Sequence, residues 1–409
     1  GSGDDTYVFA SGDVGASESI DDSNGSNVIT TAGAGASVDF SNLTDGDNGT
    51  LDQISEIVID GGNTATFTGS QLNGLTTTVN ESSDTAGTTL DIDVADDANV
   101  DFSGLTFSTS TADGLDANDG ADIDVGAGAS GSSVTGTSIN DDISGGAGND
   151  TLSGDAGDDV LDGGAGDDDL TGGTGTDEFI VSAGTDTIND LNTGETLQVS
   201  TGATANVDVI GDFTANSQTS NDGGTVTLTV ANDVDIDLTA ALVETTSDDG
   251  YTITAAGNTA ASTLIGSDGN DTITGGDSGD TIQGLLGGDD VTGGTGDDQF
   301  IYSSNDEIVG DTISGNAGTD TIILDVAAAN YDFDELLQQV SGIERLDLTG
   351  DGAYTIDFGD SNNLIPASGL LEVARSNGSG AVDIDASAMA SNGVAIQGSD
   401  FGGNDTFDA

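Results

Sequence analysis

Residues 136–189 read GTSINDDIS GGAGNDTLS GDAGDDVLD GGAGDDDLT GGTGTDEFI VSAGTDTIN, which are six consecutive nonapeptides without an insertion. Position six of every unit is an aspartate: Asp141, Asp150, Asp159, Asp168, Asp177 and Asp186. Position eight is apolar in every unit: Ile143, Leu152, Leu161, Leu170, Phe179 and Ile188. A seventh, degenerate unit keeps Glu195 and Leu197 in the same places. A disordered linker does not hold apolar residues in phase over so many periods, so the pattern indicates folded structure.

The same period returns from Gly266 as GSDGNDTIT GGDSGDTIQ GLLGGDDVT GGTGDDQFI. Residues 302–305 break the register, which then resumes as DEIVGDTIS GNAGTDTII. The aspartates at position six of this block are Asp271, Asp280, Asp289, Asp298, Asp311 and Asp320. Both ends of the chain resemble cut units with Asp5 and Asp405 in the key place, so we expect more repeats beyond each end.

The spacing of the nonapeptide defines a strand and a turn. Three residues around the apolar position form a short strand whose middle side chain points inward. The preceding G-G-x-G-x-D forms a turn, because its glycines permit left-handed backbone angles and leave carbonyl groups bare. Two units make one coil, so aspartates 18 residues apart stack: Asp141, Asp159 and Asp177 on one edge, and Asp150, Asp168 and Asp186 on the other.

Stacked aspartates require a counter-charge. Carboxylates one strand spacing apart, about 4.8 Å, repel each other unless a cation lies between them. The chain has no His and no Cys, so its ligands are oxygens, which select Ca²⁺ or Mg²⁺. Flexible turns rich in carbonyl groups favour Ca²⁺, which takes about six to eight oxygen ligands. The sequence therefore predicts multiple bound Ca²⁺ ions.

The nonapeptide resembles the RTX (repeat-in-toxin) family, whose parallel β-roll is built from G-G-x-G-x-D-x-U-x. Residues 145–152 and 163–170 fit at each fixed position, whereas Ile139, Asp155 and Ser278 replace consensus glycines. The resemblance implies type I export, and Ca²⁺ held by the position-six aspartates and by neighbouring backbone carbonyls. The glycines that it adds to the candidate metal sites are Gly146, Gly148, Gly157, Gly164, Gly166, Gly173, Gly175, Gly269, Gly276, Gly294, Gly296 and Gly318.

The composition excludes most catalytic chemistry. There are 75 acidic and 2 basic residues, a formal net charge of −73, and no His, Cys, Lys or Trp. Nucleophiles paired with His, thiolate zinc sites and Schiff-base lysines are therefore impossible, and we predict no enzymatic activity and no catalytic residues. Such a polyanion does not hold a phosphate backbone, so nucleic acid is not a partner. No apolar run reaches the length of a membrane span, which argues against membrane insertion.

The sequence outside the nonapeptide blocks predicts β-strands that belong to wider coils. Three long stretches alternate with period two, as in Leu90-Asp91-Ile92-Asp93-Val94, and this predicts strands with one apolar and one acidic face. Their recurrence suggests rungs of a wider β-helix in line with the rolls, with separate sandwiches as the open alternative. A short helix is expected over 332–340, and Arg345 and Arg375 are expected to be buried partners of carboxylates.

The expected fold is therefore all-β and elongated, with parallel β-roll blocks alternating with wider β-rich segments. The predicted boundaries are a truncated RTX end at 1–10, β-rich segments at 11–135, 199–265 and 325–397, RTX blocks at 136–198 and 266–324, and a further RTX start at 398–409. The second RTX block contains the short insertion at 302–305, and the last β-rich segment contains the expected helix.

These features favour a structural extracellular protein, a surface-layer or surface-fibre subunit on a bacterial cell that needs Ca²⁺ to fold and to assemble. Its expected partners are copies of itself, with cell-surface polysaccharide as a further candidate. Residues 340–348, VSGIERLDL, resemble a segment that recurs in bacterial surface-layer proteins with RTX repeats. Two alternatives stay open: a calcium-stiffened segment of a large adhesin, and the RTX region of a secreted enzyme whose catalytic domain lies elsewhere.

Overall fold

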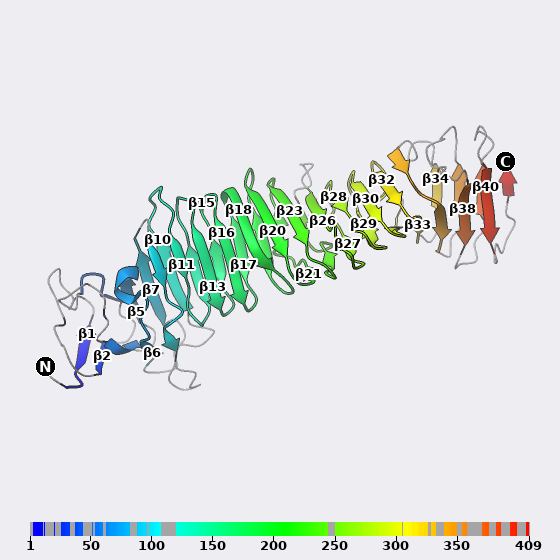
Figure 1. Cartoon of the computed structure of the whole chain (residues 1–409). Coiled ribbons are helices and arrows are strands. Elements are labelled where there is room, and N and C mark those ends of the chain that lie inside the picture. The colour runs from blue at the N-terminus through cyan, green and yellow to red at the C-terminus, as the bar shows by residue number, and fades with distance from the viewer. Residues whose placement is uncertain are drawn as a thin grey trace. The chain divides into compact units, whose positions relative to one another are not determined.

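The computed structural model is built almost entirely from parallel β-strands. It describes residues 3–10, 12, 20, 26–32, 37–43, 51, 54–59, 63–81, 88–95, 98–107, 120–243, 250–304, 306–325, 329–332, 339–349, 354–357, 370–375, 382–385, 393–398 and 406–408. The chain divides into two compact units, residues 1–205 and 206–409. Each unit is a β-solenoid in which a strand pairs with strands one coil before and after it (Figure 1).

The described residues of the first unit form strands of three parallel sheets. One sheet has the order β1 (Thr6–Ala10), β2 (Asn27–Ala32), β4 (Ile54–Ile59), β6 (Thr78–Glu81), β9 (Thr106–Phe107). A second runs β3 (Ser37–Asp39), β5 (Thr64–Thr68), β7 (Thr89–Val94), β10 (Gly120–Val125), β12 (Asp141–Ser144), β14 (Val160–Asp162), β17 (Glu178–Val181), β19 (Thr196–Val199). A third runs β8 (Asn99–Asp101), β11 (Ser133–Thr135), β13 (Thr151–Ala156), β16 (Asp169–Thr174), β18 (Ala183–Leu191), and β15 (Ala165–Gly166) also pairs with β18. Strand β20 (Thr204–Val209) lies at the division between the units.

The core of the repeat block is made by the apolar residues at position eight. Ile143, Leu161 and Phe179 are register partners in β12, β14 and β17, and each is fully buried. Leu152 and Leu170 occupy the matching places in β13 and β16. Each buried aliphatic side chain contributes roughly 1.5–3 kcal/mol by removal from water. The predicted short strands and inward side chains are thus confirmed, although β13 and β16 extend into the turn.

The predicted wider segment before residue 136 continues the same stack. Ala121 of β10 pairs with Asp141 of β12 on one side and with Leu90 of β7 on the other. These partners lie 20 and 31 positions away, so the coil widens while the register is kept. The open question between a continued solenoid and a separate sandwich is settled in favour of the solenoid. The predicted boundaries of the segments stay a prediction.

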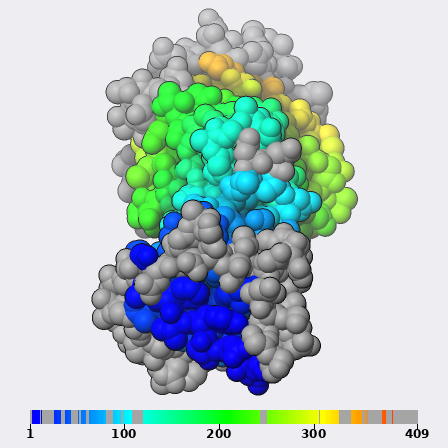
Figure 2. Space-filling view, turned by 90° about the vertical axis from the view of Figure 1, so that its left-hand side faces the viewer, coloured from blue at the N-terminus to red at the C-terminus, as the bar shows by residue number. Residues whose placement is uncertain are grey.

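A four-residue helix, α1 (Gly69–Leu72), was not expected from the sequence. Its buried Gln71 donates from Nε2 to the carbonyl oxygens of Phe40, at 2.8 Å, and Leu43, at 2.5 Å, and so satisfies two backbone groups inside the coil. Figure 2 shows the face of this unit that carries β1, in dark blue. Strand β1 is less buried than β2, because β1 is the edge of its sheet.

The second unit repeats this design. One sheet runs β23 (Thr225–Val230), β26 (Tyr251–Thr254), β28 (Thr272–Thr274), β30 (Asp290–Thr295), β32 (Thr312–Ala317), β35 (Val340–Ser341). Another runs β21 (Phe213–Thr214), β24 (Ile236–Asp237), β27 (Thr263–Ile265), β29 (Thr281–Gln283), β31 (Gln299–Tyr302), β33 (Thr321–Leu324), β36 (Arg345–Leu348), β38 (Leu370–Arg375), β40 (Gly393–Gly398). Shorter sets are β34 (Ala329–Asp332), β37 (Tyr354–Asp357), β39 (Val382–Asp385), β41 (Thr406–Asp408), and the pair β22 (Ser220–Asn221), β25 (Leu242–Val243).

The helix predicted over 332–340 is not found at the two ends of that range. Asp332 ends strand β34 and Val340 begins β35, while residues 333–338 lie outside the described part of the chain. Apolar residues at helical spacing suggested a helix, but parallel pairing with β37 and β32 fixes the flanking residues as strand.

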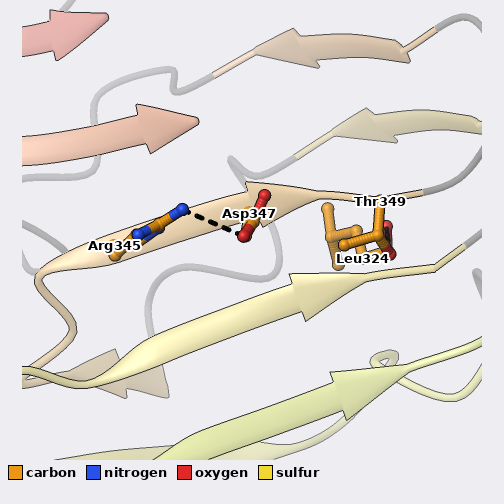
Figure 3. Close-up of polar contacts among 4 residues, drawn as sticks. All are labelled: Leu324, Arg345, Asp347 and Thr349. Carbon is orange, nitrogen blue, oxygen red and sulfur yellow. Dashed lines mark hydrogen bonds and ion pairs between the residues drawn. The ribbon is translucent and has the colours of Figure 1, made fainter. Parts of the chain in front are cut away.

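Both arginines lie in this unit. Arg345 donates from Nη2 to Asp347 Oδ2 at 3.0 Å on β36, which runs beside the Leu324 end of β33 (Figure 3). The Arg345 side chain is 35% exposed, so this ion pair, which we expected to be buried, is only partly buried. Arg375 is buried, and its guanidinium carbon lies 5.6 Å from the ring centroid of Tyr354.

Candidate metal centre

The position-six aspartates form four columns, each with members one coil apart in the stack. The columns are Asp141–Asp159–Asp177, Asp150–Asp168–Asp186, Asp271–Asp289–Asp311 and Asp280–Asp298–Asp320. Within a column, the backbone N–H of one aspartate donates to Oδ1 of the next at 2.8–3.0 Å. The predicted stacking of same-side aspartates is therefore found. The step is 18 residues in the first block and becomes 22 across the register break in the second.

The second carboxylate oxygen is the notable feature of these columns. Oδ2 is buried and has no hydrogen-bond partner in seven aspartates of the described chain: Asp159, Asp168, Asp177, Asp186, Asp289, Asp298 and Asp320. An anionic oxygen buried without a partner costs more free energy than a neutral one. Native proteins leave few such atoms, so seven in one structural motif require an explanation.

The glycines of these turns lie close to backbone carbonyl oxygens of the neighbouring coil. A Cβ at Gly164 would overlap the carbonyl oxygen of Gly146 one coil earlier, and a Cβ at Gly166 would overlap that of Gly148. Gly164 also has a φ of +88°, a left-handed conformation that glycine adopts without cost. The turns of successive coils therefore approach closely and line up carbonyl oxygens beside the aspartate columns.

Burial raises the pKa of these carboxyl groups. Desolvation, with a smaller repulsion from a neighbouring aspartate, raises the pKa of Asp159 to about 7 and that of Asp289 to about 8. Desolvation likewise raises the pKa of Asp186 to about 7 and that of Asp168 to about 6. Burial disfavours the charged form of these carboxyl groups, so a cation bound beside the columns would favour their ionised form.

The donor set of these turns fits a hard divalent cation. It offers carboxylate and carbonyl oxygens, the ligands of Ca²⁺ and Mg²⁺. No three carboxylates converge on one point among the residues that the structure describes, so carbonyl oxygens would complete a coordination sphere. Such a mixed set suits the flexible, higher coordination of Ca²⁺ better than the strict octahedron of Mg²⁺. The Asp Oδ2 atoms and the turn carbonyls would hold the ion, and the ion would supply positive charge between coils.

The other predicted site residues divide by backbone conformation. Positive φ occurs at Gly146, Gly148, Gly157, Gly164, Gly166, Gly173, Gly175, Gly294, Gly296 and Gly318, as expected for these turns. Gly269 and Gly276 do not have positive φ.

Asp5 lies before β1, and its backbone N–H donates to Asn27 Oδ1 at 3.2 Å, which repeats the column contact with an amide. Asp405 lies outside the described residues. The metal-ligand roles of the predicted residues stay a prediction.

A second ladder runs along position five and was not foreseen. Asn140 Oδ1 accepts a hydrogen bond from the backbone N–H of Asp158 at 2.8 Å. Asp158 Oδ1 in turn accepts one from the backbone N–H of Thr176, also at 2.8 Å. Asn149 and Asp167 make the equivalent contacts on the other edge. The recurrence of Asn or Asp before the position-six aspartate was the available signal.

Fold and site together define a parallel β-roll whose turns are lined for divalent cations. A family model described as RTX calcium-binding nonapeptide repeat (4 copies) matches residues 135–170, 265–300 and 303–325. The match of these three segments to the RTX calcium-binding repeat supports a calcium-binding structural role for the chain. No curated protein matches the chain. RTX repeats are typical of secreted proteins, and none of the described helices is long and apolar enough to cross a membrane.

Proposed function

We propose that this chain is a non-catalytic, extracellular calcium-binding subunit of a bacterial surface layer or surface fibre, exported by type I secretion. Several Ca²⁺ ions bind in its turns and are required for folding. The observation that carries the proposal is the set of seven buried Oδ2 atoms without a hydrogen-bond partner.

Electrostatics supports calcium as a folding partner rather than a passive ligand. Two carboxylates stacked about 4.8 Å apart repel by roughly 3.5 kcal/mol at an effective dielectric constant of about 20. The chain carries a formal charge of −73 with two basic residues, so it has almost no positive side chains to offset this repulsion. Ca²⁺ that binds only the folded state adds stability through mass action, about 2.7 kcal/mol per site at a hundredfold excess over Kd.

The outer face of one sheet supports assembly through shared ions. Asp91, Asp122 and Asp142 are register partners across β7, β10 and β12, and Asp93 pairs with Asp124 beside them. Asp93, Asp122, Asp124 and Asp142 are exposed. An exposed acidic strip of this kind repels a second copy unless Ca²⁺ lies between them. We therefore propose copies of the chain as partners, with calcium concentration controlling their contact.

Two measurements test the proposal. Circular dichroism of the chain at about pH 8, where the buried aspartates are ionised, is expected to show β-structure in Ca²⁺ and to lose it in excess chelator. An unchanged β-rich spectrum in chelator at that pH would refute calcium-dependent folding. Electron microscopy in Ca²⁺ is expected to show an ordered lattice or fibre. Isolated rods would refute the assembly role and favour the adhesin alternative, while leaving calcium-dependent folding intact.

A further inference from the structure

The turns of the repeat blocks exist in two states, distinguished at position two of the nonapeptide. In an open turn, the position-six aspartate has no donor on Oδ2. In a closed turn, a donor from within the chain occupies that oxygen. Positive φ at position two accompanies the open state at six turns, whose position-two residues are Asp155, Gly164, Gly173, Leu285, Gly294 and Asn316. Asp186 is also open, although Ser182 at its position two lacks positive φ.

Three closed turns use the backbone N–H of position two. Thr137 donates this N–H to Asp141 Oδ2 at 2.6 Å, Ser267 to Asp271 Oδ2 at 2.7 Å, and Gly276 to Asp280 Oδ2 at 2.6 Å. None of these position-two residues has positive φ. The hydroxyls of Thr137 and Ser267 add a second donor to the same carboxylates, at 2.8 and 3.1 Å to Oδ1. Hydrogen bonds thus stabilise the Oδ2 atoms of these three aspartates, and an open turn has no donor on that oxygen.

A fourth turn is closed by a side chain from the register break. The buried Tyr302 hydroxyl donates to Asp311 Oδ2 at 3.1 Å, while Asp311 Oδ1 accepts the N–H of Asp289. Both oxygens of Asp311 therefore have protein donors. Next to Tyr302, the Ser303 N–H donates to the Glu307 carboxylate at 2.6 Å. The break in the repeat thus places a phenol on Asp311 Oδ2, whereas the same oxygen of Asp289, one coil earlier in the column, has no donor.

The closed turns lie at defined places in the stack. Asp141, Asp271 and Asp280 each begin a column, because the residues at the matching position one coil earlier are Ala121, Tyr251 and Ser262, and Asp311 ends a column. The fourth column begins at Asp150, where Gly146 has positive φ. An ion held between two coils needs oxygen ligands from both coils. At the first aspartate of a column, only the coil that carries this aspartate supplies a carboxylate, because the preceding coil has none at the matching position.

We propose that Ca²⁺ occupies the open turns only, and that Asp141, Asp271, Asp280 and Asp311 are metal-free ends of the columns in which hydrogen-bond donors replace the ion. This inference rests on the proposed calcium-dependent function and deepens it, because it assigns which turns bind. It also separates the serines and threonines at position two. Where the hydroxyl contacts the position-six aspartate, as at Thr137 and Ser267, the turn marks the start of a calcium ladder; Ser182, whose hydroxyl contacts Asp162, does not.

The first test compares Asp177→Asn with Asp141→Asn in the full chain by isothermal titration with Ca²⁺. The two positions lie in the same column, and in both variants the amide oxygen can replace one carboxylate oxygen. Asp177→Asn is expected to reduce the number of ions bound, or to weaken binding at that site by at least about tenfold, the cost of changing even an outer-shell group. Asp141→Asn is expected to leave the number and affinity of bound ions unchanged. Equal losses in the two variants would overturn the inference.

The second test does not depend on the folding of Asp141→Asn. Tyr302→Phe removes the donor on Asp311, whereas Tyr251→Phe changes another buried tyrosine whose hydroxyl has no hydrogen-bond partner among the described residues. At about pH 4.5, where protonated aspartates leave the chain folded without calcium, we expect Tyr302→Phe to lower the calcium-free thermal midpoint by about 2–4 °C relative to Tyr251→Phe. At about pH 8 in Ca²⁺, Tyr302→Phe is expected to bind no fewer ions than the unmodified chain. Equal calcium-free midpoints, or fewer ions in Tyr302→Phe, would overturn the assignment of Asp311.

Failure of this inference is distinguishable from failure of the proposed function. An unmodified chain that takes up no Ca²⁺ overturns both. An unmodified chain that binds Ca²⁺, but loses it equally on substitution of open and closed turns, overturns only the division into two states.

Discussion

Without calcium, the stability of the protein is expected to fall as pH rises through the range in which its buried aspartates ionise. The perturbation is a pH series from 4 to 8 in excess chelator at constant ionic strength. Folded-state pKa values of about 7 for Asp159 and Asp186 and about 8 for Asp289 lie above the unfolded value of 3.8. Between these limits the folded state holds protons that the unfolded state has released, so the free energy of unfolding decreases with pH.

The magnitude follows from proton counting. Each group that is protonated when folded and ionised when unfolded contributes a slope of about −1.4 kcal/mol per pH unit. Even one of these three carboxyls therefore produces a loss of roughly 3 kcal/mol between pH 4.5 and 6.5, which is large beside the usual stability of a domain. Stability from these groups is fully present below about pH 4 and is lost by about pH 8.

Urea denaturation monitored by circular dichroism at each pH gives the slope of the free energy of unfolding against pH. In millimolar Ca²⁺ the sign is expected to reverse, because the ion binds ionised carboxylates and competes with protons. A calcium-free midpoint that stays constant or rises between pH 4.5 and 7 would refute the conclusion that the columns are buried carboxyls lacking a counter-charge.

Three further predictions concern packing, turns and metal choice. Leu161→Ala is expected to lower the free energy of unfolding in Ca²⁺ by about 2–5 kcal/mol, whereas the 42%-exposed Leu286→Ala changes it by less than about 0.5 kcal/mol; similar urea midpoints would contradict the assigned core. Gly166→Ala, which meets the Gly148 carbonyl, is expected to cost several kcal/mol in the same assay, against about 1 kcal/mol for Gly202→Ala, which has positive φ but open space; equal costs would argue against close stacking of turns. Replacing Ca²⁺ by Mg²⁺ at equal concentration is expected to give a lower thermal midpoint, because the turns do not impose an octahedron; equal midpoints would contradict the preference for calcium.

Much of this architecture follows from the nonapeptide alone. The apolar residue at position eight and the aspartate at position six fix the coil length, so the register of Ile143 with Leu161 and the stacking of Asp141 with Asp159 were predictable. The wider coils were harder to predict, because alternating residues such as those of β7 identify a strand but not its partner. Only the pairing with β10 shows that the intervening chain returns to the same sheet.

The division of the turns into two states could not be predicted from the aspartates. It depends on whether the N–H at position two donates to the carboxylate. Thr137 makes this hydrogen bond, whereas Leu285 takes a positive φ that leucine disfavours, and Asp289 Oδ2 has no donor. The contact between Tyr302 and Asp311 is also hidden in the sequence, because it arises from the path of the loop between β31 and β32. Position-two hydroxyls would have been a usable signal at the first unit of each block.

The four extra residues between Tyr302 and Asp311 have a practical consequence. Strand β32 pairs with β30 so that Val291 is the register partner of Ile313, as though no residues had been added between β31 and β32. The solenoid therefore tolerates a change of length at this corner without a shift in the strands that follow. A peptide epitope or a cysteine for labelling, grafted at this corner, should be displayed outside the roll while the strands on either side keep their pairing.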